Sequence, residues 1–401
     1  MTPKIDSVDD LPLTASSKVD GRPFRVSVVV PAFNHADYVG EALRSVFAQE
    51  FDGLEIILVD DGSNDGTADL AEALLQGQKI PFQIVRQPNQ GAHAAINKGI
   101  ALARGEWISI LNSDDRYIAG RIAQLMGHAI NAKSRFVFSR VRFIGPDGNP
   151  LPASTPVISY YEYALGLRDV YPTPNFELLR HDYAISTGNY FFHHSLVDEM
   201  GPFRDFKICH DWDFILRALL VEEVSYLNEV LYEYRVHSSN TIQPSVKDLR
   251  DQETDILISD YLLHAEQASN PLAPSRKNWG RYWDYFLTNQ MELLAYLPGV
   301  KSALETCLAG PPSDESGIKP HLTSAITQYT RRVEELRNEN AKLQAQLAGL
   351  PPTGELPPLP ARTLFYFWLR KLFYPLYHML KGSWVRKLKN RFKSTLVAGP
   401  K

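Results

Sequence analysis

Pairs of adjacent carboxylates are the residues whose type and spacing could do chemistry in this sequence. Asp60 and Asp61 follow the apolar run 56–59, and Asp114 and Asp115 follow a second apolar run. Adjacent like charges cost stability unless a cation or hydrogen-bond donors meet them. One such pair is often only a turn or a helix cap, and GSNDGT has that composition. Two pairs indicate a site where Mg²⁺ or Mn²⁺ and a diphosphate would relieve the repulsion.

A third acidic group lies in CHDWDFILRAL, residues 209–219. Asp211 and Asp213 open an apolar helical pattern, so one of them could simply cap a helix. The other would then be free to act as a general base. The spacing alone does not choose between the two.

Motifs of several other enzyme classes are missing from the sequence. No G-x-x-x-x-G-K-[ST] occurs and no G-x-G-x-x-G follows the first apolar run, which disfavours P-loop NTPases and standard dinucleotide dehydrogenases. There is also no H-E-x-x-H, no zinc-type Cys/His spacing and no G-x-S-x-G. The chemistry is therefore expected to depend on the carboxylates.

Alternating strands and helices would position these carboxylates. The pattern predicts strands at 25–33, 54–59, 82–87 and 106–111, separated by helices at 37–49, 66–76 and 91–105. Such βαβ units form a parallel sheet with right-handed crossovers. Ligands bind at the carboxyl ends of parallel strands, where both Asp pairs fall.

The remaining sequence divides into further units. Residues 25–132 and 133–240 read as two halves of one α/β domain, and 241–310 reads as a helical extension. The extension carries an apolar stripe that is expected to be core rather than a cofactor site. Its members are Trp279, Trp283, Phe286, Leu287, Met291 and Leu294.

The segment 321–350 carries a heptad pattern with Asn340 at an a position, which predicts an oligomerising coiled coil. Parallel pairing would bring Arg332 near Arg337, so a merely solvated helix is the alternative. Residues 351–361 form a Pro-rich linker.

The tail, residues 362–401, contains ten Lys or Arg and no Asp or Glu. Trp384, Leu388 and Phe392 share one helical face, as in a helix that lies on an anionic membrane. Docking on the protein itself and nucleic-acid binding are the alternatives, and no nucleic-acid partner is expected.

The other compositional features favour the cytoplasm. Residues 1–24 are polar, read as a disordered lead-in and lack the apolar region of a signal peptide. No run reaches the roughly 18 apolar residues of a membrane span. Cys209 and Cys307 offer no disulfide framework.

Four motifs, in this order, resemble the family 2 glycosyltransferases of the GT-A fold over residues 25–240. They are VSVVVPAFNHADYVGEALRSVFAQ, LEIILVDDGSNDGT, NQGAHAAINKGIALARGEWISILNSDD and CHDWDFILRAL. The resemblance implies a Rossmann-like α/β domain of the GT-A type. It also implies inverting transfer of a sugar from a nucleotide diphosphate to a hydroxyl, with a divalent metal, Mn²⁺ or Mg²⁺.

The resemblance implies roles for individual residues of the donor side. Pro31 and Phe33 would line the nucleotide base, and Asp61 would accept hydrogen bonds from it. Asp114 would contact the ribose. Asp115, as the final acid of the D-x-D signature, would hold the metal.

The resemblance also implies roles on the acceptor side. Asp211 matches the catalytic base, and 186–203 looks like the acceptor segment. His237 stands where some relatives contact metal or diphosphate, although a His closing a strand is often only packed. Two departures are Asn112, in place of the first D-x-D acid, and His210, where Glu is common.

We therefore expect a cytoplasmic glycosyltransferase that is peripheral on the inner face of the cell membrane through 362–401 and forms a homo-oligomer through 321–350. Its expected partners are a nucleotide-sugar donor and a glycan or lipid-linked acceptor of cell-surface polysaccharide synthesis. The alternative is a catalytically degenerate nucleotide-binding scaffold that works through its coiled coil and membrane tail, and Asn112 and His210 motivate it.

Overall fold

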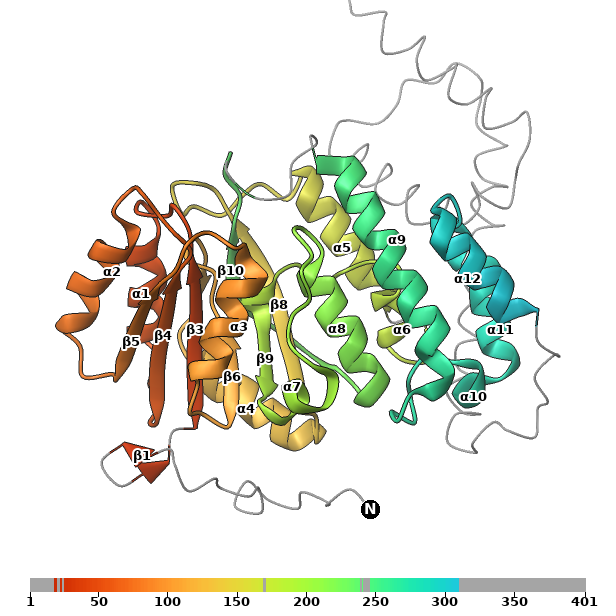
Figure 1. Ribbon diagram of the computed structural model, residues 1–401, viewed down its shortest axis with the longest axis horizontal. Helices are drawn as coiled ribbons and strands as arrows, with labels where there is room; N and C mark the ends of the chain where they lie inside the picture. The colour runs from red at the N-terminus through yellow and green to blue at the C-terminus, as the bar shows by residue number, and fades with distance from the viewer. Residues whose placement is uncertain are drawn as a thin grey trace, which may run out of the picture.

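An eight-stranded mixed sheet forms the centre of the protein (Figure 1). The computed structural model describes residues 18–19, 22–23, 25–168, 171–238, 240 and 246–309. From edge to edge the sheet contains β5 (Phe82–Arg86), β4 (Leu54–Asp60), β3 (Val26–Ala32), β6 (Trp107–Ile110), β9 (Tyr190–His193), β8 (Phe136–Ile144), β10 (Ser225–Arg235) and β7 (Arg116–Tyr117). A separate small sheet pairs β1 (Lys18–Val19) with β2 (Arg22–Pro23).

The prediction of a parallel sheet is confirmed for four neighbouring strands, but the sheet as a whole is mixed. β5, β4, β3 and β6 pair in parallel, as do β8 and β10. β9 runs antiparallel to both β6 and β8, and β7 runs antiparallel to β10. A short apolar strand carries no mark of its direction, because the direction depends on the connections at its ends.

The helices of the first two thirds of the chain pack on this sheet and on one another. They are α1 (Val39–Phe47), α2 (Thr67–Gln76), α3 (Ala92–Leu102), α4 (Arg121–Ala132), α5 (Pro156–Arg168), α6 (Asn175–Leu178), α7 (Ser195–Met200) and α8 (His210–Val221). α3 packs on β3 and β4, whereas α4 packs on β8 and β10. β4 is buried along its whole length, which explains its continuous apolar run.

Four helices follow in the described part of the last third, at the opposite end of the molecule from α1 and α2 (Figure 1). They are α9 (Lys247–His264), α10 (Arg276–Trp279), α11 (Arg281–Asn289) and α12 (Pro298–Leu308). α9 packs against both α8 and α12. Trp279, Trp283 and Phe286 are buried in the main core, where their rings surround Phe176 of α6. The interpretation of this aromatic stripe as core is confirmed.

Several expectations concern residues that the structure does not describe. The coiled coil at 321–350, the linker at 351–361 and the basic tail at 362–401 all lie outside the described residues, as does most of the lead-in, 1–24. Within the described ranges, no helix is both long enough and apolar enough to cross a membrane.

Candidate active site

Two loops at the carboxyl ends of β3 and β4 are joined by hydrogen bonds. The Asn34 backbone N–H donates to Ser63 Oγ over 2.9 Å, and Asn34 Oδ1 accepts from the Asn64 N–H over 3.0 Å. The His35 N–H donates to Thr67 Oγ1 over 2.8 Å. Asn34 has φ 53°, a left-handed conformation that Asn adopts more readily than most residues. This network fixes the backbone of the loop that carries His35.

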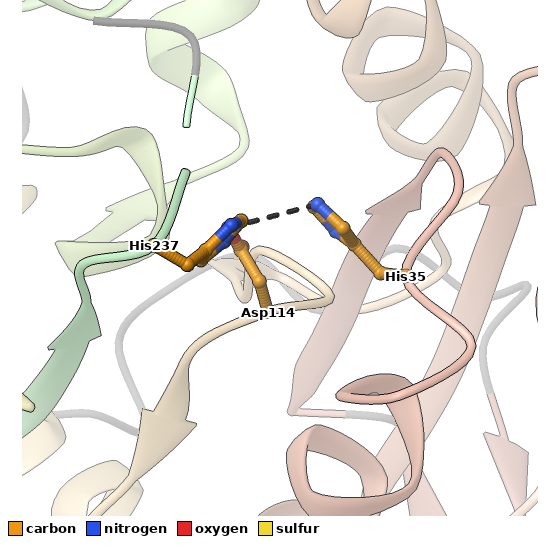
Figure 2. A group of neighbouring side chains, drawn as sticks. All are labelled: His35, Asp114 and His237. Carbon is orange, nitrogen blue, oxygen red and sulfur yellow. Dashed lines mark hydrogen bonds and ion pairs between the residues drawn. The ribbon is translucent and has the colours of Figure 1, made fainter. Parts of the chain in front are cut away.

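His35, Asp114 and His237 point toward one another from three separate loops (Figure 2). His237 Nε2 lies 2.9 Å from Asp114 Oδ2, and His35 Nε2 lies 3.8 Å from the same oxygen. One potential ligand atom from each residue lies within 4.8 Å of the others. Sequence reasoning found Asp114, as a ribose contact, and His237, as a metal or diphosphate contact, but missed His35, which lies inside the first of the four motifs.

The chemistry of this cluster fits a divalent cation. Burial lowers the pKa of His35, which favours the neutral imidazole that can bind a metal. His35 Nδ1 lies 2.8 Å from Ser113 Oγ, so a proton on Nδ1 would leave a lone pair on Nε2. Carboxylate oxygen suits Mg²⁺ and Mn²⁺, and imidazole nitrogen shifts the preference toward a transition metal.

Asp115 is occupied by protein groups, which differs from the expectation that it holds the metal. Its Oδ1 accepts from the Arg235 backbone N–H over 2.7 Å, and its Oδ2 accepts from the Tyr232 hydroxyl over 2.6 Å. Burial and the neighbouring Asp114 raise the pKa of Asp115 well above its usual range. The Arg235 backbone and the Tyr232 side chain, both of β10, cover Asp115. Asp114 instead faces the two histidines.

Asn112, which replaces the first acid of the D-x-D signature, connects this loop to the acceptor side. Its Nδ2 donates to Ser186 Oγ over 2.8 Å and to Asp115 Oδ2 over 3.3 Å. Its Oδ1 accepts from Thr187 Oγ1 over 3.2 Å. A carboxylate at this position could not donate and would add a like charge beside Asp115. The departure from the family pattern therefore has a structural reason.

Arg235 is a second residue that sequence reasoning missed. Its side chain is fully buried and donates to the Asp114 backbone carbonyl over 2.7 Å and to Glu41 Oε2 over 2.7 Å. Together with the backbone bond to Asp115, these contacts hold the 114–115 loop in place. The only signal in the sequence is an Arg two residues before His237.

Asp61 anchors the loop between β5 and α3. Its Oδ1 accepts from Gln87 Nε2 and from the Gln90 N–H, and its Oδ2 accepts from the Gly91 N–H, each over 2.8 Å. A carboxylate has about four lone-pair positions, so one remains for a ligand. Hydrogen bonds from protein amides therefore relieve part of the repulsion between Asp60 and Asp61.

Pro31 and Phe33 lie at the end of β3, beside this loop. Pro31 is partly buried, and the Phe33 side chain is 43% exposed, so its ring is accessible to a base. Asp60 Oδ2 accepts from the Ser63 N–H over 3.3 Å, within the turn that follows β4.

The structure distinguishes Asp211 from Asp213 at the start of α8. Asp213 is buried and forms ion pairs with both Arg204 and Arg217, so its role is structural. Asp211 accepts only from the Trp212 N–H, over 2.8 Å, among its described side-chain hydrogen bonds. Burial raises the pKa of Asp211 to about 7, and Glu253 contributes. A carboxyl group with this pKa can act as a base near neutral pH.

Segment 186–190 connects Asp211 to the 112–115 loop, because Ser186 Oγ accepts from Asn112 Nδ2 and the Tyr190 hydroxyl donates to the Asp211 backbone carbonyl. Burial raises the pKa of Tyr234, and the charges of Asp115, Asp114 and Asp211 raise it further. The charges of one loop and of α8 therefore both act on this phenol. Asp114 and His237 lie in one cluster with His35, and Asp61 lies in the loop that is bonded to the His35 loop.

Gly188 makes this region sensitive to one added methyl group. A Cβ at residue 188 would lie 1.8 Å from the Tyr232 hydroxyl oxygen and 3.0 Å from the Asn112 backbone nitrogen. We expect Gly188→Ala to lower the free energy of unfolding by about 2 kcal/mol, since the core must shift. Urea denaturation measures this. Gly127→Ala, where nothing lies within 4 Å, is the matched control and should be neutral or stabilising.

Comparison with known proteins identifies the family of the chain. The Glycosyl transferase family 2 model matches residues 27–200. An uncharacterized glycosyltransferase of Rickettsia typhi is 30% identical over 231 residues, which cover 57% of this chain and 69% of the relative. The putative teichuronic acid biosynthesis glycosyltransferase TuaG of Bacillus subtilis is 33% identical over 129 residues, 31% of this chain and 50% of TuaG.

Among solved structures, S. aureus TarS 1-349 in complex with UDP aligns with a TM-score of 0.49 and 18% identity, over 79% of this chain and 91% of TarS 1-349. This similarity is too low to transfer a ligand or a residue role. The sequence relationship to the Rickettsia protein is strong enough to assign the family. The chain belongs to the family 2 glycosyltransferases.

Proposed function

We propose that this family 2 glycosyltransferase moves a sugar from a nucleotide-diphosphate donor to a hydroxyl group, with inversion at the anomeric carbon. The observation that carries the proposal is the convergence of His35, Asp114 and His237 on one point beyond the carboxyl ends of the strands. Asp114 belongs to a possible metal cluster, and Asp211 has the properties of a base. These are the two groups that transfer of a sugar from a diphosphate requires.

The donor nucleotide would bind across the ends of β3 and β4. The exposed Phe33 ring would stack on the base beside Pro31, and the remaining lone-pair position of Asp61 would accept from a base N–H. This assignment keeps the expected roles of the three residues. The identity of the base is left to the binding experiment below.

The metal would be held by His35, Asp114 and His237, which revises the expected ligand Asp115. When bound, a divalent cation neutralises the negative charge that develops on the leaving diphosphate. The two imidazole nitrogens favour Mn²⁺ over Mg²⁺. The hydrogen bond between His35 and Ser113 would orient the first of these rings.

Asp211 would act as the general base. Its carboxylate removes the proton of the acceptor hydroxyl while that oxygen bonds to the anomeric carbon. The bond from this carbon to the diphosphate oxygen breaks at the same time, so the configuration inverts. Burial, which raises the pKa of Asp211 to about 7, makes the carboxylate a stronger base than an exposed Asp.

The acceptor would be a glycan or a lipid-linked precursor of a cell-surface polysaccharide. The assignment of TuaG to teichuronic acid biosynthesis supports this class of acceptor. The predicted coiled coil and basic tail would bring the enzyme to the inner face of the membrane as an oligomer. Both of these segments lie outside the described residues.

Calorimetry with nucleoside diphosphates tests the metal site. We expect uridine or guanosine diphosphate to bind the full chain more tightly with Mn²⁺ than without it. His237→Ala should weaken the binding measured with Mn²⁺ by at least about tenfold and leave the metal-free binding unchanged. His264→Ala is the control, since this His lies exposed on α9, 53% accessible at its side chain.

Two outcomes would contradict the proposal in different ways. Nucleotide binding that does not depend on the metal would remove the assigned role of the His35, Asp114 and His237 cluster. Absence of both metal-dependent binding and sugar turnover would instead favour the scaffold alternative.

A further inference from the structure

The outward face of α9 carries three exposed apolar side chains. Leu249, Ile256 and Leu263 are 38%, 53% and 50% exposed, and they recur every seven residues. Gln252 and Ser259 lie between them, so the face advances by alternate threes and fours. We call these five residues the α9 stripe. Single exposed apolar residues are common on protein surfaces, but a seven-residue repeat along one helix is the pattern of one side of a coiled coil.

The other faces of α9 already have partners. Leu257 and Ile258 are buried in the main core. Asp255, on the flank, accepts from the backbone N–H groups at the start of α12, and Cys307 Sγ, near the end of α12, donates to the Leu262 backbone carbonyl over 3.4 Å. α12 therefore runs beside α9 in the same direction and covers this flank. The apolar members of the α9 stripe remain uncovered by the described residues.

The chain beyond α12 supplies a segment with a matching pattern. In the heptad segment 321–350, Tyr329, Leu336 and Leu343 also recur every seven residues. Val333 and Asn340 lie between them, so this seam too advances by alternate fours and threes. Two helical seams with the same 3.5-residue period stay in contact along their length.

The connection 310–320 is long enough for the heptad segment to reach the α9 stripe. Because α12 ends beside Leu262, residue 309 lies close to the Leu263 end of α9. An extended chain spans at most about 3.6 Å per residue, so residues 310–320 reach about 40 Å. α9 has 18 residues and is therefore only about 27 Å long. The heptad segment can thus fold back along α9 from Leu263 to Leu249, antiparallel to it.

One antiparallel register matches the two patterns. Asn340 is the polar residue of the heptad seam, and a single polar a position specifies register. It fits opposite Gln252, whose side-chain amide has no hydrogen-bond partner among the described residues. The alternative polar partner, Ser259, already donates from its Oγ to the Ile256 backbone carbonyl over 3.1 Å. This register pairs Leu263 with Tyr329, Ser259 with Val333, Ile256 with Leu336 and Leu249 with Leu343.

Charge and tethering favour this partner over a second copy of the heptad segment. In a parallel pair of 321–350 segments, Arg332 would lie near Arg337. α9 instead presents Asp255 and Asp260 on the flanks of the α9 stripe, and the Asp260 side chain is 32% exposed. A segment tethered to the same chain also binds at a high effective concentration, whereas pairing of two copies depends on the protein concentration.

We propose that the heptad segment 321–350 packs antiparallel on the α9 stripe of its own chain. This contact takes the place of pairing with a second copy, since both would use the same apolar seam. The docking does not depend on the proposed sugar transfer.

The docked segment directs the basic tail toward the Asp211 end of the molecule. Glu253, one turn beyond Leu249, binds the backbone of residues 207–209, which precede Asp211 at the start of α8. Leu343, placed opposite Leu249, therefore lies at this end, and the linker and the tail continue from there. A tail bound to a membrane would then hold the catalytic end toward the bilayer. This consequence, unlike the docking itself, rests on the proposed function.

A disulfide between introduced cysteines tests the contact and its register. Ile256→Cys and Leu336→Cys are combined in the full chain, which is oxidised with diamide at low and at high protein concentration. We expect an intrachain disulfide in most molecules at both concentrations, seen by non-reducing electrophoresis and intact mass. Ile256→Cys with Glu334→Cys, at an outward b position of the heptad, is the matched control and should stay reduced. The single variants exclude disulfides with the native Cys209 and Cys307.

Three results of this experiment would overturn the inference. A disulfide between two chains would show that the heptad segment binds a second copy. Equal yields in the pair and its control would show that the segment makes no defined contact with the α9 stripe. Absence of any disulfide would show that the segment does not reach the α9 stripe in this register.

Hydrogen exchange tests the same docking without introduced cysteines. The amides of 326–343 should exchange at least about tenfold faster in Ile256→Asp than in wild type, because a charge in the α9 stripe disrupts the docking and leaves the core intact. Ser302→Asp, at an exposed position of α12, is the control. Exchange that Ile256→Asp does not change would contradict the docking. Neither experiment measures sugar transfer, so a failure of the proposed function would leave both results unaffected.

Discussion

Replacing Asp211 with Asn should lower kcat for sugar transfer about a thousandfold, with little change in KM for the donor. The amide keeps the size of the side chain but cannot take the proton of the acceptor hydroxyl, and general-base catalysis contributes about 10²–10⁴ to rate. The donor side, formed by Phe33, Asp61 and the His35 loop, is not touched by this change. Steady-state kinetics with varied donor concentration measures both constants.

The thermal stability of the Asp211→Asn variant is a control, because it should be unchanged or raised while kcat falls. Burial raises the pKa of Asp211 from 3.8 to about 7, so ionising the folded protein costs stability as the pH rises through this range. Asp211→Asn removes that cost and should melt at the same or a higher temperature at pH 8. Asp213→Asn breaks two ion pairs of a buried carboxylate and should melt lower. A variant of Asp211 that keeps most of the wild-type kcat would eliminate it as the base.

Glu253→Ala should lower the free energy of unfolding by about 3 kcal/mol and kcat by about a hundredfold. The Glu253 side chain on α9 is buried, and its Oε1 accepts from the Lys207 N–H over 2.7 Å. Its Oε2 accepts from the Ile208 and Cys209 N–H groups, each over 2.9 Å. These three donors immediately precede α8, so their loss frees the loop that sets the position of Asp211.

Chemical denaturation and steady-state kinetics on the same protein samples measure the two effects. Glu305→Ala, at an exposed position of α12, is the matched control and should change neither quantity appreciably. Glu253→Gln keeps one acceptor oxygen and should fall between the wild type and the Ala variant. Full activity in a destabilised Glu253→Ala protein would show that this contact supports the fold without positioning the base.

The order of strands and helices in the first 111 residues was readable because each element carries a clear hydrophobic period. The strand expected at 54–59 is β4 at Leu54–Asp60, and the helix expected at 66–76 is α2 at Thr67–Gln76. The acid pairs lie at the strand ends because parallel strands bring their carboxyl ends to one edge. The antiparallel β9 was not foreseen, since its direction depends on a long connection through α5 and α6.

The individual ligands of the candidate site could not be read in the same way. His35 and Asp114 are 79 positions apart, and His237 is a further 123 positions away, so no local spacing joins them. Neighbouring residues at a strand end point in different directions, and the Arg235 backbone and the Tyr232 hydroxyl determine that Asp115 is the one covered. This explains why the metal was expected on Asp115 while the histidines surround Asp114.

The contact between Glu253 and the amides of residues 207–209 also has a consequence for how such a chain can change over time. The Glu253 carboxylate on α9 and the backbone of residues 207–209 must fit each other. Neither segment can therefore be replaced alone by the equivalent segment of another protein. Recombination at the boundary near residue 240 would separate Glu253 from the backbone of residues 207–209 that it binds. The helices of 247–308 are therefore expected to be inherited together with the transferase core, as one module rather than as an interchangeable appendage.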